Sequence, residues 1–168
     1  GGFALAALAG EAPEALAVDS SAPALELAAG GAARMGAADR FETRRADAFE
    51  ALAALGAEGA RFGLVVSDPP AFAPHKDARA QGLRAYERLA RLAAPLVEPG
   101  GVLVLCSCSH AADVESFHRA SADGIAKAGR TAQLVHSGRA GPDHPQHPAL
   151  PETGYLKALV FRLIDGAA

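Results

Sequence analysis

A cysteine within a polar tetrapeptide is the residue of this 168-residue sequence best suited to nucleophilic chemistry. Cys108 lies in the stretch S-C-S-H at 107–110, directly after the apolar run 102–106. A thiolate can act as a nucleophile when it reaches the ligand-binding edge of a sheet, and His110 could help it to ionise. Cys106 has apolar neighbours, as inert structural cysteines usually do. We therefore predict that Cys108 is catalytic and that Cys106 is structural.

The two cysteines offer neither a disulfide nor a metal site. A bridge between residues two apart on a strand would be strained. A zinc site needs further Cys or His ligands at a suitable spacing, and no second pair follows. We therefore predict free thiols and no bound metal.

A second candidate site is the stretch D-P-P-A-F at 68–72, which follows the apolar run 62–67. The two prolines end the strand, because proline cannot continue a central strand, and they hold the acid in a fixed direction. A loop of this kind can hydrogen-bond a flat nitrogen heterocycle. An acid, two prolines and an aromatic together exceed what a plain turn requires, and functional residues concentrate on such loops. We therefore predict a functional role for Asp68.

Three further positions near the start of the chain are suited to binding a nucleoside. Gly1 and Gly2 open a helix, where small residues let backbone N–H groups approach a ligand, although a glycine pair is more often a simple turn. Asp19 ends an apolar run about 18 residues later and could accept both hydroxyls of a ribose. Asp47 could receive an adenine amino group. Both acids could instead be helix caps, and for Asp47 that alternative is slightly favoured.

Strands and helices are expected to alternate along the chain, which favours a mostly parallel α/β sheet. The expected strands are 15–19, 41–45, 62–67, 102–106, 131–136 and 155–163, of which 62–67 and 102–106 are apolar enough to be buried. The expected helices are 1–9, 21–35 with Ser21 as its cap, 47–55, 83–96, and about 112–128 with Val114, Phe117 and Ile125 facing inward. Residues 71–80 and 137–154 are expected to be loops, and residues 99–101 a turn.

The chain is expected to be one catalytic domain, 1–168, with a Rossmann-like sheet, helices on both faces and an antiparallel C-terminal strand. An open sheet of this class starts with a strand that feeds a glycine-rich turn. The sequence opens on the glycines, so we expect that the first strand is missing from it.

The composition describes a globular, cytoplasmic protein. Half of the residues are hydrophobic and the net charge is −3. No apolar run is long enough to span a bilayer, and no signal peptide is recognisable, so no membrane partner is expected. A negative net charge argues weakly against a stand-alone nucleic-acid-binding protein, because phosphate contacts favour a basic surface. A homodimer is compatible with the sequence.

Taken together, these motifs resemble the bacterial class I methyltransferases that make 5-methylcytosine in large-subunit (23S) ribosomal RNA. The resemblance is carried by GGFALAAL, VDSSAPALELA, DAFEAL, SDPPAF, PGGVLVLCSCS, the D-H-P at 143–145 and GYLKALVFRL. It covers essentially the whole chain. Members of that family use S-adenosylmethionine and carry a separate N-terminal RNA-binding domain of the PUA type, which this sequence lacks. The resemblance therefore implies an N-terminally truncated catalytic domain.

The resemblance also implies roles for individual residues. Cys108 matches the family's catalytic cysteine, and Asp68 would face both the reactive end of the cofactor and the target base. The remaining cofactor contacts would be Gly1, Gly2, Phe3, Asp19, Ser20, Asp47, Ala48 and Pro69. Contacts to the ribosomal RNA would come from Pro70, Phe72 and Lys76, with the basic loop residues His75, Arg79, Arg84 and Arg139 nearby. Phe72 and Tyr86 are candidates to stack or pack beside a flipped base, and for Tyr86 core packing is favoured.

The implied reaction explains the need for a cysteine. Carbon 5 of cytosine is a poor nucleophile, and a thiolate that adds to carbon 6 makes it reactive enough to attack a sulfonium methyl group. Asp68 could stabilise the charged ring at its N3 and amino edge. The base that removes the carbon 5 proton is not assigned; Asp68 and water are the candidates.

Three alternatives stay open at the level of the sequence. D-P-P-aromatic loops also serve enzymes that methylate exocyclic amino groups, which need no thiolate. The truncated start could leave a folded domain that binds no cofactor. A nicotinamide-dependent oxidoreductase on a similar sheet has no support, because no complete G-x-G-x-x-G is visible.

Overall fold

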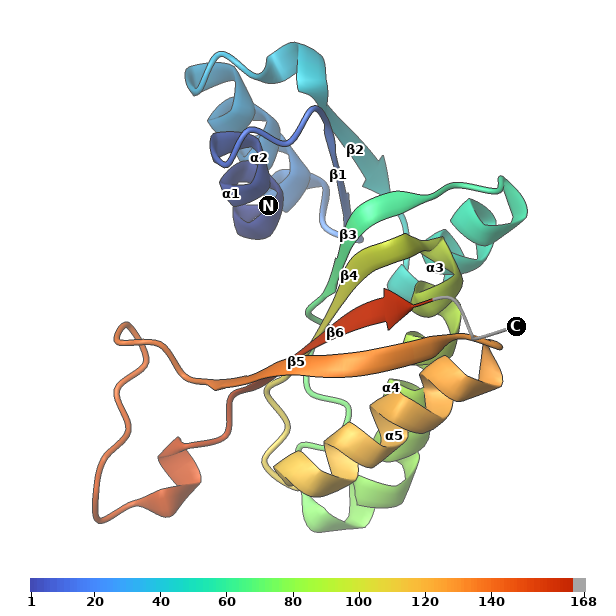
Figure 1. Cartoon of the computed structure of the whole chain (residues 1–168). Helices are drawn as coiled ribbons and strands as arrows, with labels where there is room; N and C mark the ends of the chain where they lie inside the picture. The colour runs from blue at the N-terminus through green and yellow to red at the C-terminus, as the bar shows by residue number, and fades with distance from the viewer. Residues whose placement is uncertain (165–168) are drawn as a thin grey trace. The chain divides into compact units, whose positions relative to one another are not determined.

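The structure, a computed structural model, describes residues 1–164, and the chain divides into two compact units. Unit 1 comprises residues 1–54 and unit 2 begins at residue 55, so that the division falls inside helix α3 (Ala48–Ala57). Figure 1 shows the elements of each unit. The predicted alternation of strands and helices is confirmed throughout.

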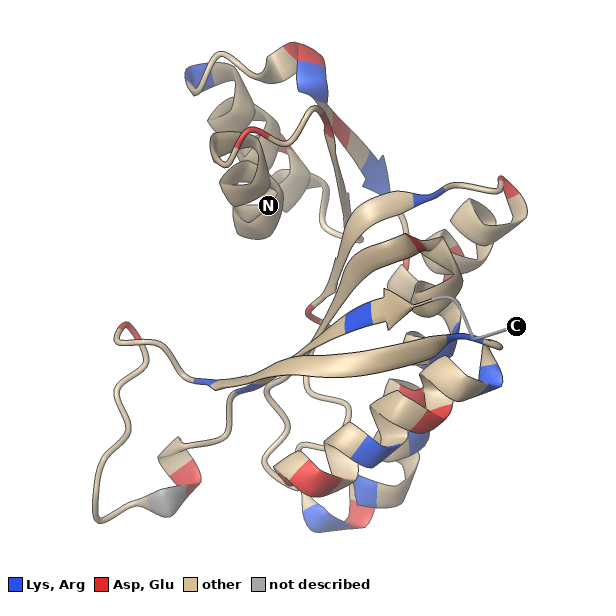
Figure 2. Cartoon of the chain, in the orientation of Figure 1, with Lys and Arg blue, Asp and Glu red and all other residues tan. Residues whose placement is uncertain are grey.

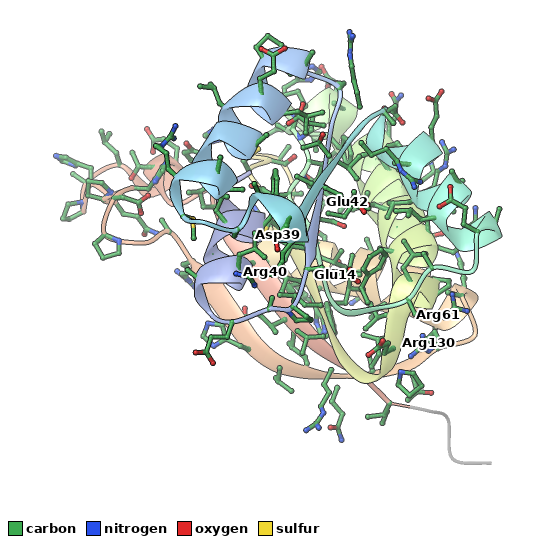
Figure 3. The ribbon with its side chains drawn as sticks, turned by 90° about the horizontal axis from the view of Figure 1, so that it is seen from above. Glu14, Asp39, Arg40, Glu42, Arg61 and Arg130 are labelled. Atoms are coloured by element: carbon green, nitrogen blue, oxygen red, sulfur yellow. The ribbon has the colours of Figure 1, made fainter. Side chains whose placement is uncertain are left out.

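Unit 1 consists of helices α1 (Gly2–Ala9) and α2 (Ala22–Arg34), the strands β1 (Ala15–Asp19) and β2 (Phe41–Arg45), and the first residues of α3. The two strands pair in parallel from Ala15 opposite Phe41 to Asp19 opposite Arg45. A one-turn 3-10 helix, Ala38–Arg40, leads into β2. The Arg40 guanidinium (Figure 3) donates a hydrogen bond to the carbonyl of Ala12, 2.7 Å away, and so links this turn to the segment that precedes β1.

Helix α2 begins where the sequence predicts. The Ser21 hydroxyl accepts a hydrogen bond from the backbone N–H of Ala24, 3.3 Å away, and Pro23 lies in the first turn, where proline costs no hydrogen bond. The apolar side of the helix carries Leu25, Ala28 and Ala32, all buried. Local capping and burial of this face together explain the helix.

Unit 2 is a mixed four-stranded sheet in the order β3-β4-β6-β5, with two helices. Its elements are β3 (Phe62–Ser67), α4 (Arg79–Ala93), β4 (Val97–Ser107), α5 (Val114–Lys127), β5 (Thr131–Arg139) and β6 (Lys157–Ile164), together with the 3-10 turns Lys76–Ala78, Ala94–Leu96 and Pro151–Thr153. β3 and β4 are parallel, and β6 runs antiparallel to both β4 and β5, which confirms the antiparallel C-terminal strand.

The core of unit 2 lies between one face of this sheet and the helix pair. Alternate residues of β4 and β6 are buried, including Leu103, Leu105 and Leu163, as expected for strands with one face against helices. The ring of Phe161 stacks with His118 of α5 at 6.0 Å between centroids. Arg130 lies just before β5 (Figure 3). Its guanidinium donates hydrogen bonds to the carbonyl of Ala94, which precedes β4, at 3.0 Å and to that of Val97, the first residue of β4, at 2.7 Å.

Helices α4 and α5 approach each other closely at Gly124. A Cβ at this position would lie 2.8 Å from the Cβ of Ala90 and 3.1 Å from the backbone nitrogen of Arg91, closer than side chains pack. The helix pair therefore requires a residue without a side chain at this point.

Several expectations were wrong in detail. The turn expected at 99–101 lies inside β4, which starts at Val97 and bulges against β3; Gly100 has φ of +77°, which only glycine adopts easily. Val114 is exposed rather than inward, because it is the first residue of α5. The strand at 62–67 is only partly buried: Leu64 is 48% exposed, and β3 is an edge strand of the four-stranded sheet.

The last two strands also differ from the prediction. β5 continues to Arg139, so that the following loop starts at residue 140 instead of 137. β6 starts at Lys157 instead of Tyr155. Both ends are set by strand pairing, since Arg139 is the cross-strand partner of Lys157.

Candidate functional site

Cys108 follows the last residue of β4 and is flanked by two buried serines. Ser107 and Ser109 are 1% and 0% exposed, whereas the Cys108 side chain is half-buried and reaches the surface. A nucleophile needs such partial access. Both cysteines are free thiols, as predicted.

A buried network of hydroxyl groups holds the two serines. Ser107 donates to the Tyr86 hydroxyl at 2.9 Å, and the Tyr86 hydroxyl and the Ser109 hydroxyl share a hydrogen bond of 2.7 Å. The backbone N–H of Ser109 donates to Ser107 at 3.2 Å. Tyr86 is 1% exposed and its ring also meets Phe117 edge-on at 4.9 Å. The preference for core packing at Tyr86 is therefore confirmed, and its hydroxyl in addition fixes the segment around Cys108.

The loop that starts at Asp68 lies against this segment. The Cys108 sulfur is 4.0 Å from the carbonyl oxygen of Pro69. Ser109 accepts a hydrogen bond from the backbone N–H of Ala73 at 2.9 Å, and the N–H of Ala111 donates to the carbonyl of Ala73 at 3.2 Å. The two stretches singled out in the sequence, 68–72 and 107–110, are thus adjacent at the carboxyl ends of β3 and β4.

The pKa values of two groups at this edge are shifted. Partial desolvation raises the pKa of Asp68 above 3.8, so that its carboxyl group keeps its proton to a higher pH than an unshifted aspartate does. Burial, followed by the negative charge of Asp68, raises the pKa of Cys106 to about 11. Cys106 is therefore a protonated, unreactive thiol at neutral pH, in agreement with the predicted structural role.

The other predicted residues of the loop differ in exposure. Phe72 is half-buried and its ring packs against Tyr86, with centroids 4.9 Å apart. Pro69 is buried, and Pro70 is exposed. Lys76 is exposed and begins the short 3-10 helix that precedes α4. Phe72 thus joins the candidate site to the core below it.

In unit 1, the predicted nucleoside-binding residues occupy helix starts and a strand end. Gly1 caps α1, and a Cβ at Gly1 would collide with the Cβ of Ala28, so the helix start is closely packed. Gly2 and Phe3 are exposed in the first turn. Asp19 is exposed at the carboxyl end of β1 and accepts a hydrogen bond from the N–H of Ser21 at 2.8 Å.

Ser20 and Asp47 are also involved in local hydrogen bonds. The carbonyl of Ser20 accepts a hydrogen bond from Arg45 at 3.2 Å. Asp47 precedes α3 and its Oδ1 accepts hydrogen bonds from the N–H groups of Phe49 and Glu50 at 2.8 and 3.2 Å. Asp47 is therefore a helix cap, the alternative that the sequence slightly favoured; Ala48 is the first residue of that helix.

The basic residues expected in loops belong mostly to regular elements. Arg79 and Arg84 lie in α4 and Arg139 ends β5, whereas His75 and Lys76 lie between β3 and α4. Arg79 pairs with Asp113 at 2.8 Å, and both line an open groove between α4 and α5. Figure 2 shows acidic and basic residues interleaved along the two helices, so the groove presents no uniformly basic surface.

The sequence assigned no role to Lys157, which is buried at the start of β6. Its ammonium donates to the carbonyls of Ser109 and Tyr155 at 2.8 and 2.7 Å. The ring of Tyr155 stacks on His110 at 4.4 Å between centroids. A lysine at the start of the apolar run K-A-L-V-F is a sequence signal that could have drawn attention to it.

Neither a membrane span nor a metal site is found within residues 1–164. No helix there is both long and apolar enough to cross a bilayer. No cluster of three or more His, Cys, Asp or Glu side chains in that range is placed to hold a metal ion.

Comparison with known proteins identifies related sequences. The chain is 35% identical over 166 residues to ribosomal RNA large subunit methyltransferase I from Yersinia pseudotuberculosis and, at the same identity, to that from Yersinia pestis. The match covers 98% of this chain and 42% of each relative. No protein-family model matches the chain.

Solved structures share the fold. A putative methyltransferase, SMU.776, in complex with S-adenosylhomocysteine matches 95% of this chain and 42% of its own, with a TM-score of 0.81 at 17% identity. NSun6 from Pyrococcus horikoshii matches 92% of this chain and 42% of its own, with a TM-score of 0.60 at 16% identity. The chain therefore shares the α/β fold of these methyltransferase structures.

The predicted Rossmann-like α/β fold of the chain is thus confirmed. The chain spans about two fifths of the length of the relatives that it matches. The adjacent stretches 68–72 and 107–110 form the candidate active site of unit 2.

Proposed function

We propose that this protein is a methyltransferase that transfers a methyl group from S-adenosylmethionine to carbon 5 of a cytosine in large-subunit ribosomal RNA, through a covalent adduct with Cys108. The observation that supports it most is the placement of Cys108, with its sulfur 4.0 Å from the Pro69 carbonyl in the loop of Asp68. The 35% identity to relatives named as ribosomal RNA large subunit methyltransferases supports the RNA substrate.

The residues of unit 1 fit the proposed cofactor. Asp19 is an exposed carboxylate at the end of a parallel strand, where a ribose binds in sheets of this type. The start of α1 at Gly1, Gly2 and Phe3, which is closely packed at Gly1, offers backbone N–H groups to an anionic group. Ser20, Asp47 and Ala48 complete the proposed contacts of this unit. In unit 2, Asp68 and Pro69 are the proposed contacts. When bound, the cofactor supplies an electrophilic methyl group.

The residues of unit 2 carry the proposed chemistry. The Cys108 thiolate adds to carbon 6 of the cytosine, which raises electron density at carbon 5. Asp68, whose pKa is raised, donates a hydrogen bond or its proton to N3 and so stabilises the negative charge that the addition places on the ring. Pro70, Phe72 and Lys76 are proposed to contact the RNA around this base. After methyl transfer, loss of the carbon 5 proton to Asp68 or water releases the thiolate.

The adduct gives a direct test. A ribosomal RNA fragment containing 5-fluorocytosine should form a stable covalent complex with the protein in the presence of S-adenosylmethionine, because fluorine at carbon 5 blocks release of the thiolate. We expect the complex with the unaltered protein and with Cys106→Ala, and none with Cys108→Ala. The complex can be measured as a shifted band in denaturing gel electrophoresis.

An amino-methylating enzyme is the second candidate, supported by the D-P-P-A-F loop alone. It predicts that Cys108→Ala still transfers radioactive methyl groups to unmodified ribosomal RNA and that the product nucleoside is methylated on nitrogen. Analysis of the product by mass spectrometry distinguishes this result from 5-methylcytidine, and a nitrogen-methylated product would contradict our proposal.

A further inference from the structure

We propose that Lys157 is a positioning residue for Cys108: its buried ammonium fixes the backbone that follows the cysteine and supplies the positive charge that favours the thiolate. The inference rests on the proposed role of Cys108 as the nucleophile. It concerns the reactivity of the thiol itself, which can be measured without cofactor or RNA.

The contacts of Lys157 join two chain segments at the edge of the sheet. Its Nζ donates to the carbonyl of Ser109, directly after Cys108, at 2.8 Å and to the carbonyl of Tyr155 at 2.7 Å. Ser107, directly before Cys108, is the cross-strand partner of Lys157. The ring of Tyr155 also stacks on that of His110, which adds a contact between the same two segments. The backbone on both sides of Cys108 is therefore attached to the start of β6.

The burial of this lysine suggests more than a structural contact. Lys157 is only 7% exposed, and its two hydrogen-bond acceptors are neutral carbonyls rather than carboxylates. A buried ammonium without a hydrogen-bonded counter-ion is costly, and a neutral amide side chain could also donate to carbonyls. The positive charge itself therefore requires an explanation.

The charged and titratable groups around Lys157 provide one. Desolvation lowers the pKa of Lys157, and this effect is opposed by the charges of Cys108 and then of Asp113 at the start of α5. Asp113 is exposed and already paired with Arg79. On the neighbouring strand β5, Arg139 is the cross-strand partner of Lys157. The Tyr86 hydroxyl of α4 is hydrogen-bonded to the hydroxyl of Ser109, whose carbonyl accepts from Lys157. A thiolate at Cys108 is thus the anion that can compensate the buried ammonium.

The test compares neutral and charged substitutions at position 157. The background is Cys106→Ser, so that Cys108 is the one remaining cysteine. Lys157→Gln keeps a hydrogen-bond donor but loses the charge, and Lys157→Arg keeps the charge. The rate of alkylation of Cys108 by iodoacetamide is followed by mass spectrometry over a pH series, with Cys108→Ser as the blank.

We expect the pH profile of alkylation to move to higher pH in Lys157→Gln, with a rate at neutral pH about tenfold lower, as the loss of one nearby charge implies. Lys157→Arg should restore most of the rate. An unchanged profile in Lys157→Gln, in a protein whose thermal unfolding remains cooperative, would overturn the proposal. If Lys157→Gln does not fold, the Lys157→Arg variant provides the test. An alkylation profile of Lys157→Arg that lies at as high a pH as that of the unfolded protein would contradict the role of the charge.

The two proposals fail separately. Absence of the fluorocytosine adduct together with a displaced alkylation profile would reject Cys108 as the methyltransferase nucleophile and retain the effect of Lys157 on its thiol. The adduct together with an unchanged profile would reject only the role of Lys157.

Discussion

The hydroxyl groups of Tyr86 and Ser109 lie 2.7 Å apart in the interior of unit 2, although 23 residues separate them in the sequence. This hydrogen bond links helix α4 to the residue that follows Cys108. Buried polar groups that satisfy one another make a structure unique, and each becomes costly when its partner is removed. The position of the candidate nucleophile is thus coupled to the stability of the core.

Removal of the Tyr86 hydroxyl should therefore destabilise the protein. Tyr86→Phe removes its hydrogen bonds with Ser107 and Ser109, and we expect a loss of about 1–2 kcal/mol in the free energy of unfolding. Urea denaturation followed by circular dichroism measures it. Ser121→Ala is the matched control, because that buried hydroxyl donates only to the carbonyl of Phe117 in its own helix. An equal effect of the two substitutions would argue against a special role of the network.

The close approach of α4 and α5 predicts intolerance of any side chain at Gly124. Gly124→Ala would place a Cβ 2.8 Å from that of Ala90, and we expect a destabilisation of about 2 kcal/mol or more. Gly56→Ala in α3 is the control: a Cβ there meets nothing within 4 Å, so that alanine should stabilise by up to about 1 kcal/mol. In thermal unfolding we expect Gly124→Ala to lower the melting temperature and Gly56→Ala to raise it. An unchanged melting temperature in Gly124→Ala would contradict the close packing of the two helices.

Asp113 should contribute stability that disappears in acid. It caps α5 by accepting from the N–H of Ser116 at 2.8 Å, and this bond, followed by Arg79, lowers its pKa from 3.8 to about 2. Because the folded state favours the carboxylate, the contribution is complete above the unfolded value and is lost as the pH falls to about 2.

The corresponding variant is Asp113→Ala, which should cost about 1 kcal/mol at neutral pH as a lost helix cap. The exposed ion pair with Arg79 adds little. The difference in unfolding free energy from the unaltered protein should shrink between pH 3.8 and about 2. Denaturant titrations at several pH values measure it, and a difference that stays constant down to the lowest pH would be evidence against the shifted pKa.

Asp19 should be required for cofactor binding if the proposed function is correct. Titration calorimetry with S-adenosylhomocysteine should show binding that is weakened about tenfold or more in Asp19→Ala, because two hydrogen bonds to a carboxylate are lost. Glu26→Ala, an exposed acid on α2 with the same change in charge, should bind as the unaltered protein does. Equal affinities of all three proteins would remove Asp19 from the proposed site.

The local and periodic features of the chain were determined by the sequence alone. Proline at 69 and 70, the Ser21 cap and the apolar periodicity placed the helices and strands, because capping, proline geometry and burial of one face act over a few residues. The pairing of the D-P-P-A-F loop with the S-C-S-H segment was also foreseeable, since parallel strands bring their carboxyl ends to one edge. The prediction that Cys106 is structural came from its apolar neighbours, and burial raises the pKa of its thiol to about 11.

Only the tertiary structure decided which residues far apart in the sequence contact one another. The bulge at Gly100, the exposure of Leu64 on an edge strand and the end of β5 at Arg139 depend on which strands pair, and strand pairing is not encoded in any local stretch. The same holds for Lys157: its partners are two carbonyl oxygens, which every residue possesses and which no side-chain pattern can reveal. Its place beside Cys108 arises because β6 returns antiparallel to β4 and brings position 157 opposite Ser107.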